Sequence, residues 1–305
     1  MAHIPDGFLG PAVIAGTTAL SAAALAVAAR RSRARLRDRQ APLLGAATAF
    51  VFAAQMFNFP LGAGTSAHLL GGVLVAVVAG PWAAMLALFS VLIVQALLFQ
   101  DGGIAALGAN TLNLAVLGAG GGYLLYRGQL ALTGAGARRR MSAAAVAAFL
   151  SAVLTGVAVG IQLGLSGMVP LRTAILVVGG AHLPVGLAEA ALTATIFGAV
   201  LRSRPDLVHE PVSASAGRRW AAGITTAAAA VALGAAAWGS ALPDALESAR
   251  ARLGLQEAVA WTTAPMPDYA APVGGPWLAA LVGVALVFGL GWLVFRLGAR
   301  GGRVA

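Results

Sequence analysis

The sequence contains no lysine and no cysteine, and only 10% of its 305 residues are charged. Without lysine the chain cannot form a P-loop of the form G-x-x-x-x-G-K-S/T, whose lysine contacts the phosphates of a bound nucleotide. We therefore expect no nucleotide binding and no ATP hydrolysis by that route. Without cysteine the chain has no disulfide, no thiolate metal ligand and no cysteine nucleophile. Any metal site must be built from nitrogen and oxygen ligands.

The chain is strongly apolar, with 59% hydrophobic residues and a mean hydropathy of +0.86. A hydrocarbon core of about 30 Å takes about 20 helical residues to cross. Runs of roughly that length predict membrane-spanning helices at residues 11–29, 41–57, 104–126, 143–165, 174–201, 220–238 and 276–295. A further apolar stretch, residues 69–98, is interrupted by Gly80-Pro81.

The arginines set the predicted orientation, because short cationic loops stay on the cytoplasmic side of a membrane. The cluster at residues 30–39 places the first connection inside and Met1 outside. The cluster at 127–140 must also be inside, which requires three crossings after Asn58 and therefore a turn at Gly80-Pro81. We predict an all-α integral membrane protein with about nine transmembrane helices, an outside N-terminus and a cytoplasmic C-terminus.

Composition divides the predicted bundle into two blocks. Residues 202–219 hold arginines, prolines and serines and predict a cytoplasmic linker between a seven-helix block, residues 1–201, and a two-helix block, residues 220–305. The second block contains a proline-rich external loop at about 240–275. Residues 1–10 carry no cation before the first apolar run and precede no A-x-A site, so we expect this terminus to be retained. We expect a prokaryotic inner or plasma membrane, with the lipid bilayer and no nucleic acid as a partner.

The four histidines divide by predicted position. His3 lies just before the first helix, and His68 lies in the external connection that enters the third, so both face the same side of the membrane. His209 falls in the cytoplasmic linker, where we expect it to be solvated. His182 and Glu189 share one helical face, where we expect packing and a mutual hydrogen bond. A histidine near a chain end is also ordinarily solvated, so the position of His3 alone leaves both readings open.

His3 can nevertheless join an unusual chelate because it is near the chain terminus. If Met1 is removed, the amine of Ala2, the backbone nitrogen of His3 and the His3 imidazole form fused five- and six-membered rings. A fourth nitrogen from His68 would complete a square-planar site, a geometry typical of Ni(II) or Cu(II). If Met1 is retained, Met1-Ala2-His3 can supply four nitrogens unaided, and His68 is then redundant.

Four stretches of the chain resemble one family in the same order. They are residues 3–9 (HIPDGFL), 54–60 with 64–72 (AQMFNFP, GTSAHLLGG), 99–103 with 107–110 (FQDGG, LGAN), and 182–184 with 189 (HLP, E). Together they resemble the NikM/CbiM family, the nickel- and cobalt-specific membrane subunits of energy-coupling-factor transporters, over residues 1 to about 201. Residues 242–247 and 264–269 resemble the small two-helix N-type (PDGLE) subunit, with Ala245 in place of the usual glycine.

The resemblance implies a ligand set. The family binds its metal through the N-terminal amine, the amide and imidazole of the second residue, and the histidine of a Gly-Thr-Ser-x-His segment, which correspond here to Met1 or Ala2, His3 and His68. The family usually begins Met-His, so Ala2 is an insertion that removal of Met1 would offset. Other polar residues near the external helix ends could orient these ligands. They are Asp6, Asn58, Thr65, Ser66, Gln100, Asp101 and Asn110, with Gln55 and Asn113 nearby.

The resemblance also implies a function. We expect a transporter subunit and not an enzyme, with Ni²⁺ or Co²⁺ as its transported substrate and with ATP hydrolysed by its partners. Those partners are a transmembrane coupling subunit and cytoplasmic ATPases. Nickel is favoured by the FQDGG segment, and a cobalt importer serving cobalamin synthesis is the alternative.

Two other classes of protein are less well supported. A stand-alone secondary nickel or cobalt permease should show an intramembrane H-x-x-x-x-D motif, which the four histidines do not make. An intramembrane metalloprotease would need H-E-x-x-H, which is absent from the sequence.

Overall fold

The computed structural model is almost entirely helical. It describes residues 3–33, 41–62, 65–134, 136–205, 208, 225–226, 228–237, 239–240, 242–255 and 263–300. The elements are α1 (Pro11–Arg33), α2 (Ala41–Met56), β1 (Phe59–Gly62), β2 (Thr65–Ala67), α3 (Gly72–Ala79), α4 (Pro81–Val94), η2 (Gln95–Phe99), α5 (Leu107–Asn110), η3 (Thr111–Gly121), α6 (Gly122–Thr133), α7 (Ala137–Leu165), α8 (Leu171–Ser203), α10 (Ala245–Arg252), η5 (Pro267–Tyr269) and α11 (Gly275–Arg300). Strands β1 and β2 pair antiparallel as a two-stranded hairpin.

Five of the described helices are long and apolar enough to cross a membrane. They span Pro11–Ser32, Pro81–Phe99, Ala137–Leu165, Leu171–Ser203 and Gly275–Leu297. Two shorter apolar helices, Ala41–Met56 and Ala228–Ala237, fall where the sequence predicts further crossings. The all-α membrane fold is therefore confirmed, while the count of nine crossings and their direction stay predictions.

The predicted turn at Gly80-Pro81 is a break between two helices. Gly80 has φ 88° and ψ 156°, a conformation that ends α3, and its N–H still bonds to the carbonyl of Ala76. Pro81 then begins α4, where its missing N–H costs nothing and its fixed φ suits the first helical turn. Helix α3 has eight residues and rises roughly 12 Å, so by itself it is shorter than the hydrocarbon core.

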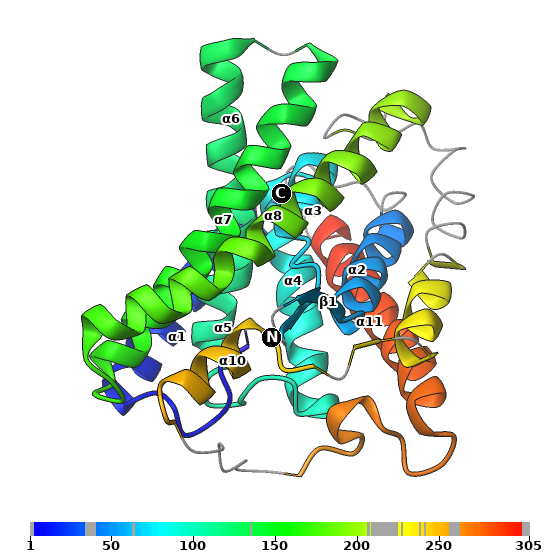
Figure 1. The fold of residues 1–305 in the computed structure, drawn as a ribbon. Helices are drawn as coiled ribbons and strands as arrows, with labels where there is room; N and C mark the ends of the chain where they lie inside the picture. The colour runs from blue at the N-terminus through cyan, green and yellow to red at the C-terminus, as the bar shows by residue number, and fades with distance from the viewer. Residues whose placement is uncertain are drawn as a thin grey trace.

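Helices α10 and α11, which the sequence assigns to a second block, pack directly on earlier helices of the chain. Helix α11 lies beside α2 (Figure 1), and the approach is close because glycines line the contact. A Cβ at Gly45 would lie 2.9 Å from the carbonyl oxygen of Phe288, and one at Gly291 would lie 2.8 Å from the hydroxyl of Thr48. Helix α10 packs against α8 and against β2. Segments from both ends of the chain therefore meet around the N-terminal segment.

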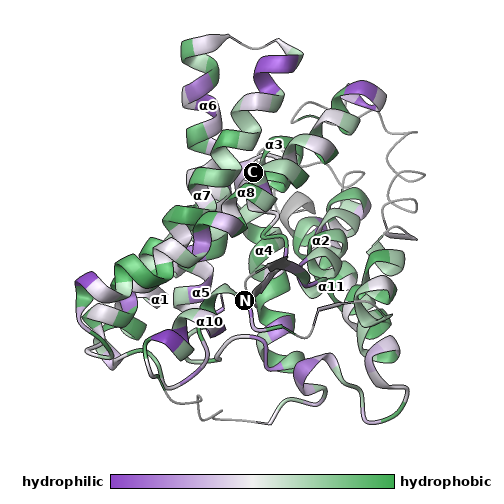
Figure 2. Ribbon diagram, in the orientation of Figure 1, coloured by the Kyte–Doolittle hydropathy of each residue, from purple (hydrophilic) through white to green (hydrophobic). Residues whose placement is uncertain are grey.

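Hydropathy follows the elements in the expected way. Figure 2 shows apolar residues along the helices and hydrophilic residues at the α6–α7 turn and at the end of α8. The first turn of α7 carries Arg138, Arg139 and Arg140, and α8 has Arg202 in its last turn. The N-terminal segment and α10 lie at a distance from this arginine-rich end (Figure 1). The sequence predicts that such a cationic end faces the cytoplasm, and this orientation stays a prediction.

Candidate metal centre

The structure brings His3 and His68 side by side. Their ring centroids lie 5.9 Å apart with an interplanar angle of 40°, and each residue is 4% exposed. A metal–nitrogen bond of about 2 Å places an ion roughly 3 Å from the centroid of each bound ring, so two rings on one ion lie at most roughly 6 Å apart, and roughly 4 Å apart when they occupy adjacent corners of a square. The two imidazoles are therefore neighbours at the outer limit of this range, and adjacent corners would require them to move closer together.

Polar side chains hold the N-terminal segment in place. The Nδ1–H of His3 donates to Oδ1 of Asp101 over 2.6 Å, while its Nε2 is buried without a hydrogen-bond partner among the described residues. The Asn110 side chain brackets Ile4, because its Oδ1 accepts from the Ile4 N–H at 2.7 Å and its Nδ2 donates to the Ile4 carbonyl at 3.0 Å. The Ile4 carbonyl also accepts from the N–H of Gly103 at 2.9 Å. Asp101 and Asn110 thus fix both the ring and the backbone around His3.

Asp6 anchors the same segment through hydrogen bonds to backbone N–H groups. Its carboxylate accepts from the backbone N–H groups of Ile104 at 3.1 Å, Ala105 at 2.9 Å and Ala106 at 3.4 Å. Gly103 lets this contact form, because a Cβ there would lie 2.2 Å from Oδ1 of Asp6. The N-terminal segment is therefore fastened along the whole loop between η2 and α5.

His68 lies on a loop that is held by α8. Both oxygens of Glu189 accept backbone hydrogen bonds, one from Leu70 at 2.8 Å and one from Gly71 at 2.9 Å, while Gln55 donates to the Leu70 carbonyl at 2.9 Å. These N–H groups lie at and just before the N-cap Gly71 of α3, and the N-terminus of a helix favours a negative charge. Glu189 thus fixes the chain just beyond His68.

The predicted hydrogen bond between His182 and Glu189 is wrong. His182 Nδ1 donates to the carbonyl of Val178 at 2.8 Å, and among the described residues Glu189 bonds to the N–H groups of Leu70 and Gly71, just before α3. Seven residues of helix rise about 10 Å, so two side chains at this spacing share a face without reaching one another. The His182 ring fills the contact between α8 and α7, where a Cβ at Gly156 would lie 2.5 Å from its Cγ.

Burial and charge set the protonation of the groups outside the membrane spans. Burial, with smaller contributions from nearby positive charge that includes His3, lowers the pKa of His68 to about 3, so its imidazole is neutral near neutral pH. Burial alone would raise the pKa of Asp101, but His3 and the hydrogen bonds from His3 and Tyr269 lower it to about 2. Burial and then Asp101 raise the pKa of Tyr269 well above 10, so its phenol keeps its proton.

Tyr269 is the site residue that sequence reasoning missed. Its hydroxyl donates to Oδ2 of Asp101, the carboxylate whose other oxygen accepts from His3. Its ring stacks on Phe99 with centroids 4.6 Å apart and an angle of 16°. A signal was present, because residues 264–269 resemble the N-type subunit, but nothing in the sequence places that loop against Asp101.

The remaining predicted residues lie around the hairpin and the loop after η2. Ser66 donates from its hydroxyl to the Leu242 carbonyl at 2.7 Å and from its N–H to the Pro243 carbonyl at 2.9 Å. The carbonyl of Asn58 accepts from the N–H of Ser240 at 2.8 Å. The backbone of Thr65 lies in β2. Ser66 and Asn58 therefore join the first block to the loop of the second.

Two of the polar residues have other neighbours. The Gln100 side chain accepts from the Ala264 N–H at 3.4 Å. Asn113, named as a nearby residue, pairs through both amide atoms with Gln162 of α7, at 2.9 and 2.7 Å. Gln100 therefore contacts the second block, whereas Asn113 is used in a helix–helix contact.

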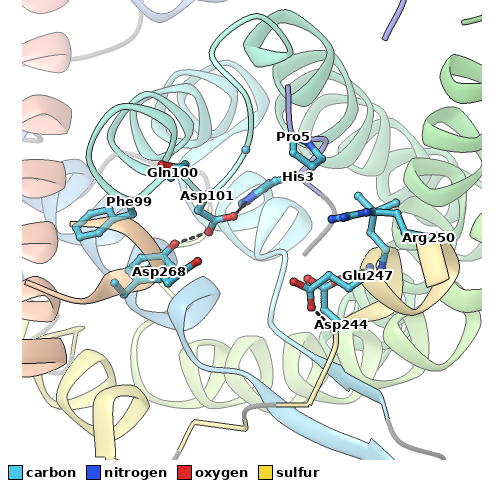
Figure 3. A pocket seen from close by; sticks show the side chains of 12 residues that line it. His3, Pro5, Phe99, Gln100, Asp101, Asp244, Glu247, Arg250 and Asp268 are labelled. Atoms are coloured by element: carbon cyan, nitrogen blue, oxygen red, sulfur yellow. Dashed lines mark hydrogen bonds and ion pairs between the residues drawn. The ribbon is translucent and has the colours of Figure 1, made fainter. Parts of the chain in front are cut away.

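A pocket of about 250 Å³ opens beside His3. Figure 3 shows the side chains that line it, which come from both blocks. Four are carboxylates, Asp101, Asp244, Glu247 and Asp268, and one is the guanidinium of Arg250. A concave site lined mainly by one sign of charge raises the local concentration of the opposite ion. At about 30 Å³ per water, the pocket is large enough for a divalent ion with six waters.

The proposed ligand set is only partly within the described residues. Met1 and Ala2 lie outside them, and the described part of the chain has no group of three or more His, Cys, Asp or Glu residues that could hold a metal. The predicted set, which combines two imidazoles with main-chain nitrogen, does not need such a group. One atom differs from the expected chelate: the six-membered ring uses Nδ1 of His3, and here Nδ1 is bonded to Asp101.

In the described geometry Nε2 is the His3 nitrogen that is left for a metal, while Asp101 holds Nδ1. A half-turn of the ring about the Cβ–Cγ bond exchanges Nδ1 with Cδ2 and Nε2 with Cε1. A chelate through Nδ1 therefore requires the ring both to turn and to shift before Nε2–H can replace Nδ1–H at Asp101.

Comparisons with known proteins agree with this architecture. Residues 3–207 match a family model described as a cobalt uptake substrate-specific transmembrane region, CbiM. The chain is 35% identical over 301 residues to a putative fused nickel transport protein NikMN of Archaeoglobus fulgidus, covering 96% of this chain and 98% of that protein. It is 34% identical to a fused nickel transport protein NikMN of Rhodobacter capsulatus, covering 93% and 94%. A solved structure titled as a transition metal transporter is 33% identical, with a TM-score of 0.60, covering 68% of this chain and 96% of that one.

Proposed function

Because the chain belongs to the CbiM family of substrate-specific transmembrane regions, we propose that it is the metal-capturing subunit of an ATP-driven nickel uptake transporter. The observation that carries the proposal is the pair of buried imidazoles, His3 and His68, whose centroids are 5.9 Å apart beside an acidic pocket. The similarity to two fused nickel transport proteins over more than nine-tenths of the chain supports nickel as the substrate.

The proposed site is a square of four nitrogens. They are the amine of Ala2 after removal of Met1, the backbone nitrogen and the imidazole of His3, and the imidazole of His68. Nitrogen ligands in a plane favour Ni²⁺ over hard cations such as Mg²⁺ and Ca²⁺, which prefer oxygen. A neutral His68 suits this role, because an imidazole binds a metal through a free lone pair. Asp101 and Asn110 orient His3, and Glu189 fixes the loop that carries His68.

The energy for transport comes from partner proteins in this proposal. The sequence has no lysine, so it offers no P-loop for a nucleotide. We assign ATP hydrolysis to cytoplasmic ATPases that act through a transmembrane coupling subunit. The arginine-rich first turn of α7 would face the cytoplasm and the pocket would face the outside, as the positive-inside rule predicts.

The two-block division belongs to the same proposal. Residues 1–201 form the metal-capture block, 202–219 the linker and 220–305 the N-type block. The family match over residues 3–207 and the fused relatives support these boundaries. In this proposal the packing of α11 on α2 and the bonds from Ser66 to Leu242 and Pro243 are contacts that join the two blocks.

Metal titration of the purified full-length chain tests the proposal. We expect one Ni²⁺ per chain by calorimetry, loss of binding in His68→Ala, and retained binding in His209→Ala, a histidine of the linker. Intact-mass measurement of the same samples shows whether Met1 is present and whether nickel is bound. A wild-type chain without Ni²⁺ or Co²⁺ binding, or a His68→Ala variant with wild-type binding, would overturn the proposal.

Cobalt is the second candidate substrate, since the family description names cobalt uptake and a cobalt transport protein CbiM of Geobacter sulfurreducens is 31% identical over 219 residues. Uptake of each metal by cells that carry the whole transporter decides between them. Uptake that persists after the ATPase genes are deleted would instead favour a stand-alone permease.

A further inference from the structure

A chain of hydrogen bonds connects the second block to a proposed metal ligand. The Tyr269 hydroxyl donates to Oδ2 of Asp101, and Oδ1 of the same carboxylate accepts from Nδ1 of His3 at 2.6 Å. All three residues are at least nine-tenths buried. Figure 3 shows the His3 ring directed at Asp101 along the edge of the pocket. The carboxylate therefore has one partner from each end of the polypeptide.

The hydroxyl proton of Tyr269 is committed to Asp101. Nε2 of Gln95 donates to the Tyr269 oxygen at 3.2 Å, so that oxygen acts as an acceptor there and must direct its own hydrogen elsewhere. The Tyr269 ring is held independently by its stacking on Phe99 and by a contact with Phe52, whose centroid lies 6.1 Å away. The phenol is thus a fixed donor aimed at one oxygen of Asp101.

Unusual backbone conformation is concentrated at this contact. In the part of the chain that the structure describes, three residues other than glycine have positive φ, namely Gln100 at 57°, Asp268 at 52° and Tyr269 at 58°. Each adjoins or forms the Asp101–Tyr269 pair. Such conformations are disfavoured for residues with a Cβ and persist where the surroundings fix them, commonly at functional sites.

The helix that leads to Asp101 is irregular as well. Residues Gln95–Phe99 form η2, a π-helical turn of the kind found frequently at functional positions. The N–H of Met266 bonds to the Leu98 carbonyl at 2.9 Å and so ties the Tyr269 loop to that turn. The segments that carry Asp101 and Tyr269 therefore both have irregular backbone geometry, and a backbone hydrogen bond joins them.

We propose that Tyr269 is a positioning residue for the metal site. Tyr269 holds Asp101, and the Asp101 carboxylate in turn fixes the His3 imidazole for the incoming ion. The inference rests on the proposed function. A histidine that binds a metal usually donates its second N–H to a carboxylate, and loss of such an outer partner typically costs 10- to 100-fold in metal affinity. Without the phenol, Asp101 has one fewer donor and is free to rotate, and the His3 ring turns with it.

The first test is Tyr269→Phe in the full-length chain, with the dissociation constant for Ni²⁺ measured by calorimetry. Phenylalanine keeps the stacking on Phe99 and removes only the donor. We expect roughly 10- to 100-fold weaker Ni²⁺ binding, with little change in the melting temperature of the metal-free protein. Tyr126→Phe is the matched control, because Tyr126 is a buried tyrosine of α6 that packs on Phe197, and it should bind Ni²⁺ as the wild type does.

A double-mutant cycle separates positioning from general packing. If Tyr269 acts through Asp101, adding Tyr269→Phe to Asp101→Ala should change the affinity no further. Wild-type affinity in Tyr269→Phe, or losses that multiply in the double variant, would overturn the inference. If His68→Ala abolishes Ni²⁺ binding while Tyr269→Phe binds Ni²⁺ as the wild type does, this inference alone is overturned. A wild-type chain without metal binding would overturn the proposed function as well.

Discussion

Glu189 of α8 accepts a hydrogen bond of 2.8 Å from the backbone N–H of Leu70, a residue 119 positions earlier in the chain. Its second oxygen accepts from the neighbouring Gly71. A carboxylate buried in an apolar helix is costly unless its oxygens are satisfied, and here the N–H groups of Leu70 and Gly71, just before α3, satisfy it. The loop that carries His68 is therefore attached to a membrane helix. A movement of α8 should for that reason also move this loop.

The first prediction concerns this attachment. Glu189→Gln keeps one acceptor but turns an amide N–H₂ toward a backbone N–H, which leaves a buried donor unsatisfied. We expect the free energy of unfolding to fall by about 1–3 kcal/mol and Ni²⁺ binding to weaken. Thermal melting and calorimetry measure the two effects. Glu247→Gln is the control for stability, because glutamine serves equally well in the capping box that Glu247 forms with Asp244. Equal stability of the two variants would contradict the prediction.

The second prediction concerns Gly103. A Cβ there would lie 2.2 Å from Oδ1 and 2.4 Å from the backbone nitrogen of Asp6, so Gly103→Ala must push the N-terminal segment off its loop. We expect a loss of about 1–3 kcal/mol in stability, as for other overpacked sites, together with weaker metal binding. Gly16→Ala in α1 is the control, since nothing lies within 4 Å of its added Cβ and alanine favours a helix. Wild-type affinity in Gly103→Ala would show that the contact with Asp6 does not position the ligands.

The helices and the two histidines were accessible from the sequence. The apolar runs locate most of the helices, and Gly80-Pro81 marks the break between α3 and α4 because proline suits a first turn and cannot continue a helix. His3 and His68 are indicated by their predicted place on one side of the membrane, by the chelate that a histidine near a chain end can form, and by motifs that resemble the family. These features are local, since each depends on residues that lie near one another in the chain.

Tyr269 and the role of Glu189 could not be predicted in the same way. Tyr269 and Asp101 are 168 residues apart, and their contact depends on how the second block packs against the first. Periodicity shows which face of a helix is apolar, but it does not show which external loops meet. For Glu189 the helical face was correct, yet its partner is a distant backbone segment and not the histidine on its own helix.

The third prediction concerns the chain terminus. If the terminal amine is a ligand, an N-terminal affinity tag should abolish tight Ni²⁺ binding, whereas the same tag at the C-terminus should leave it unchanged. Calorimetry on the two tagged proteins measures the difference. Proteolytic removal of the N-terminal tag that exposes Ala2 should restore binding and serves as the control for folding. Undiminished binding by the N-terminally tagged chain would exclude the amine from the ligand set.

The last prediction concerns the acidic pocket. Asp268 is exposed on its rim and has φ 52°, a conformation that asparagine tolerates, so Asp268→Asn removes a charge while keeping the backbone. If the carboxylates attract the ion, the association rate of Ni²⁺ should fall by a few-fold at low salt while the dissociation rate stays constant. Stopped-flow measurements at increasing ionic strength check this, because screening at about 1 M salt should remove the difference. A rate difference that persists in high salt would mean that Asp268 contacts the ion directly and does not act through its field.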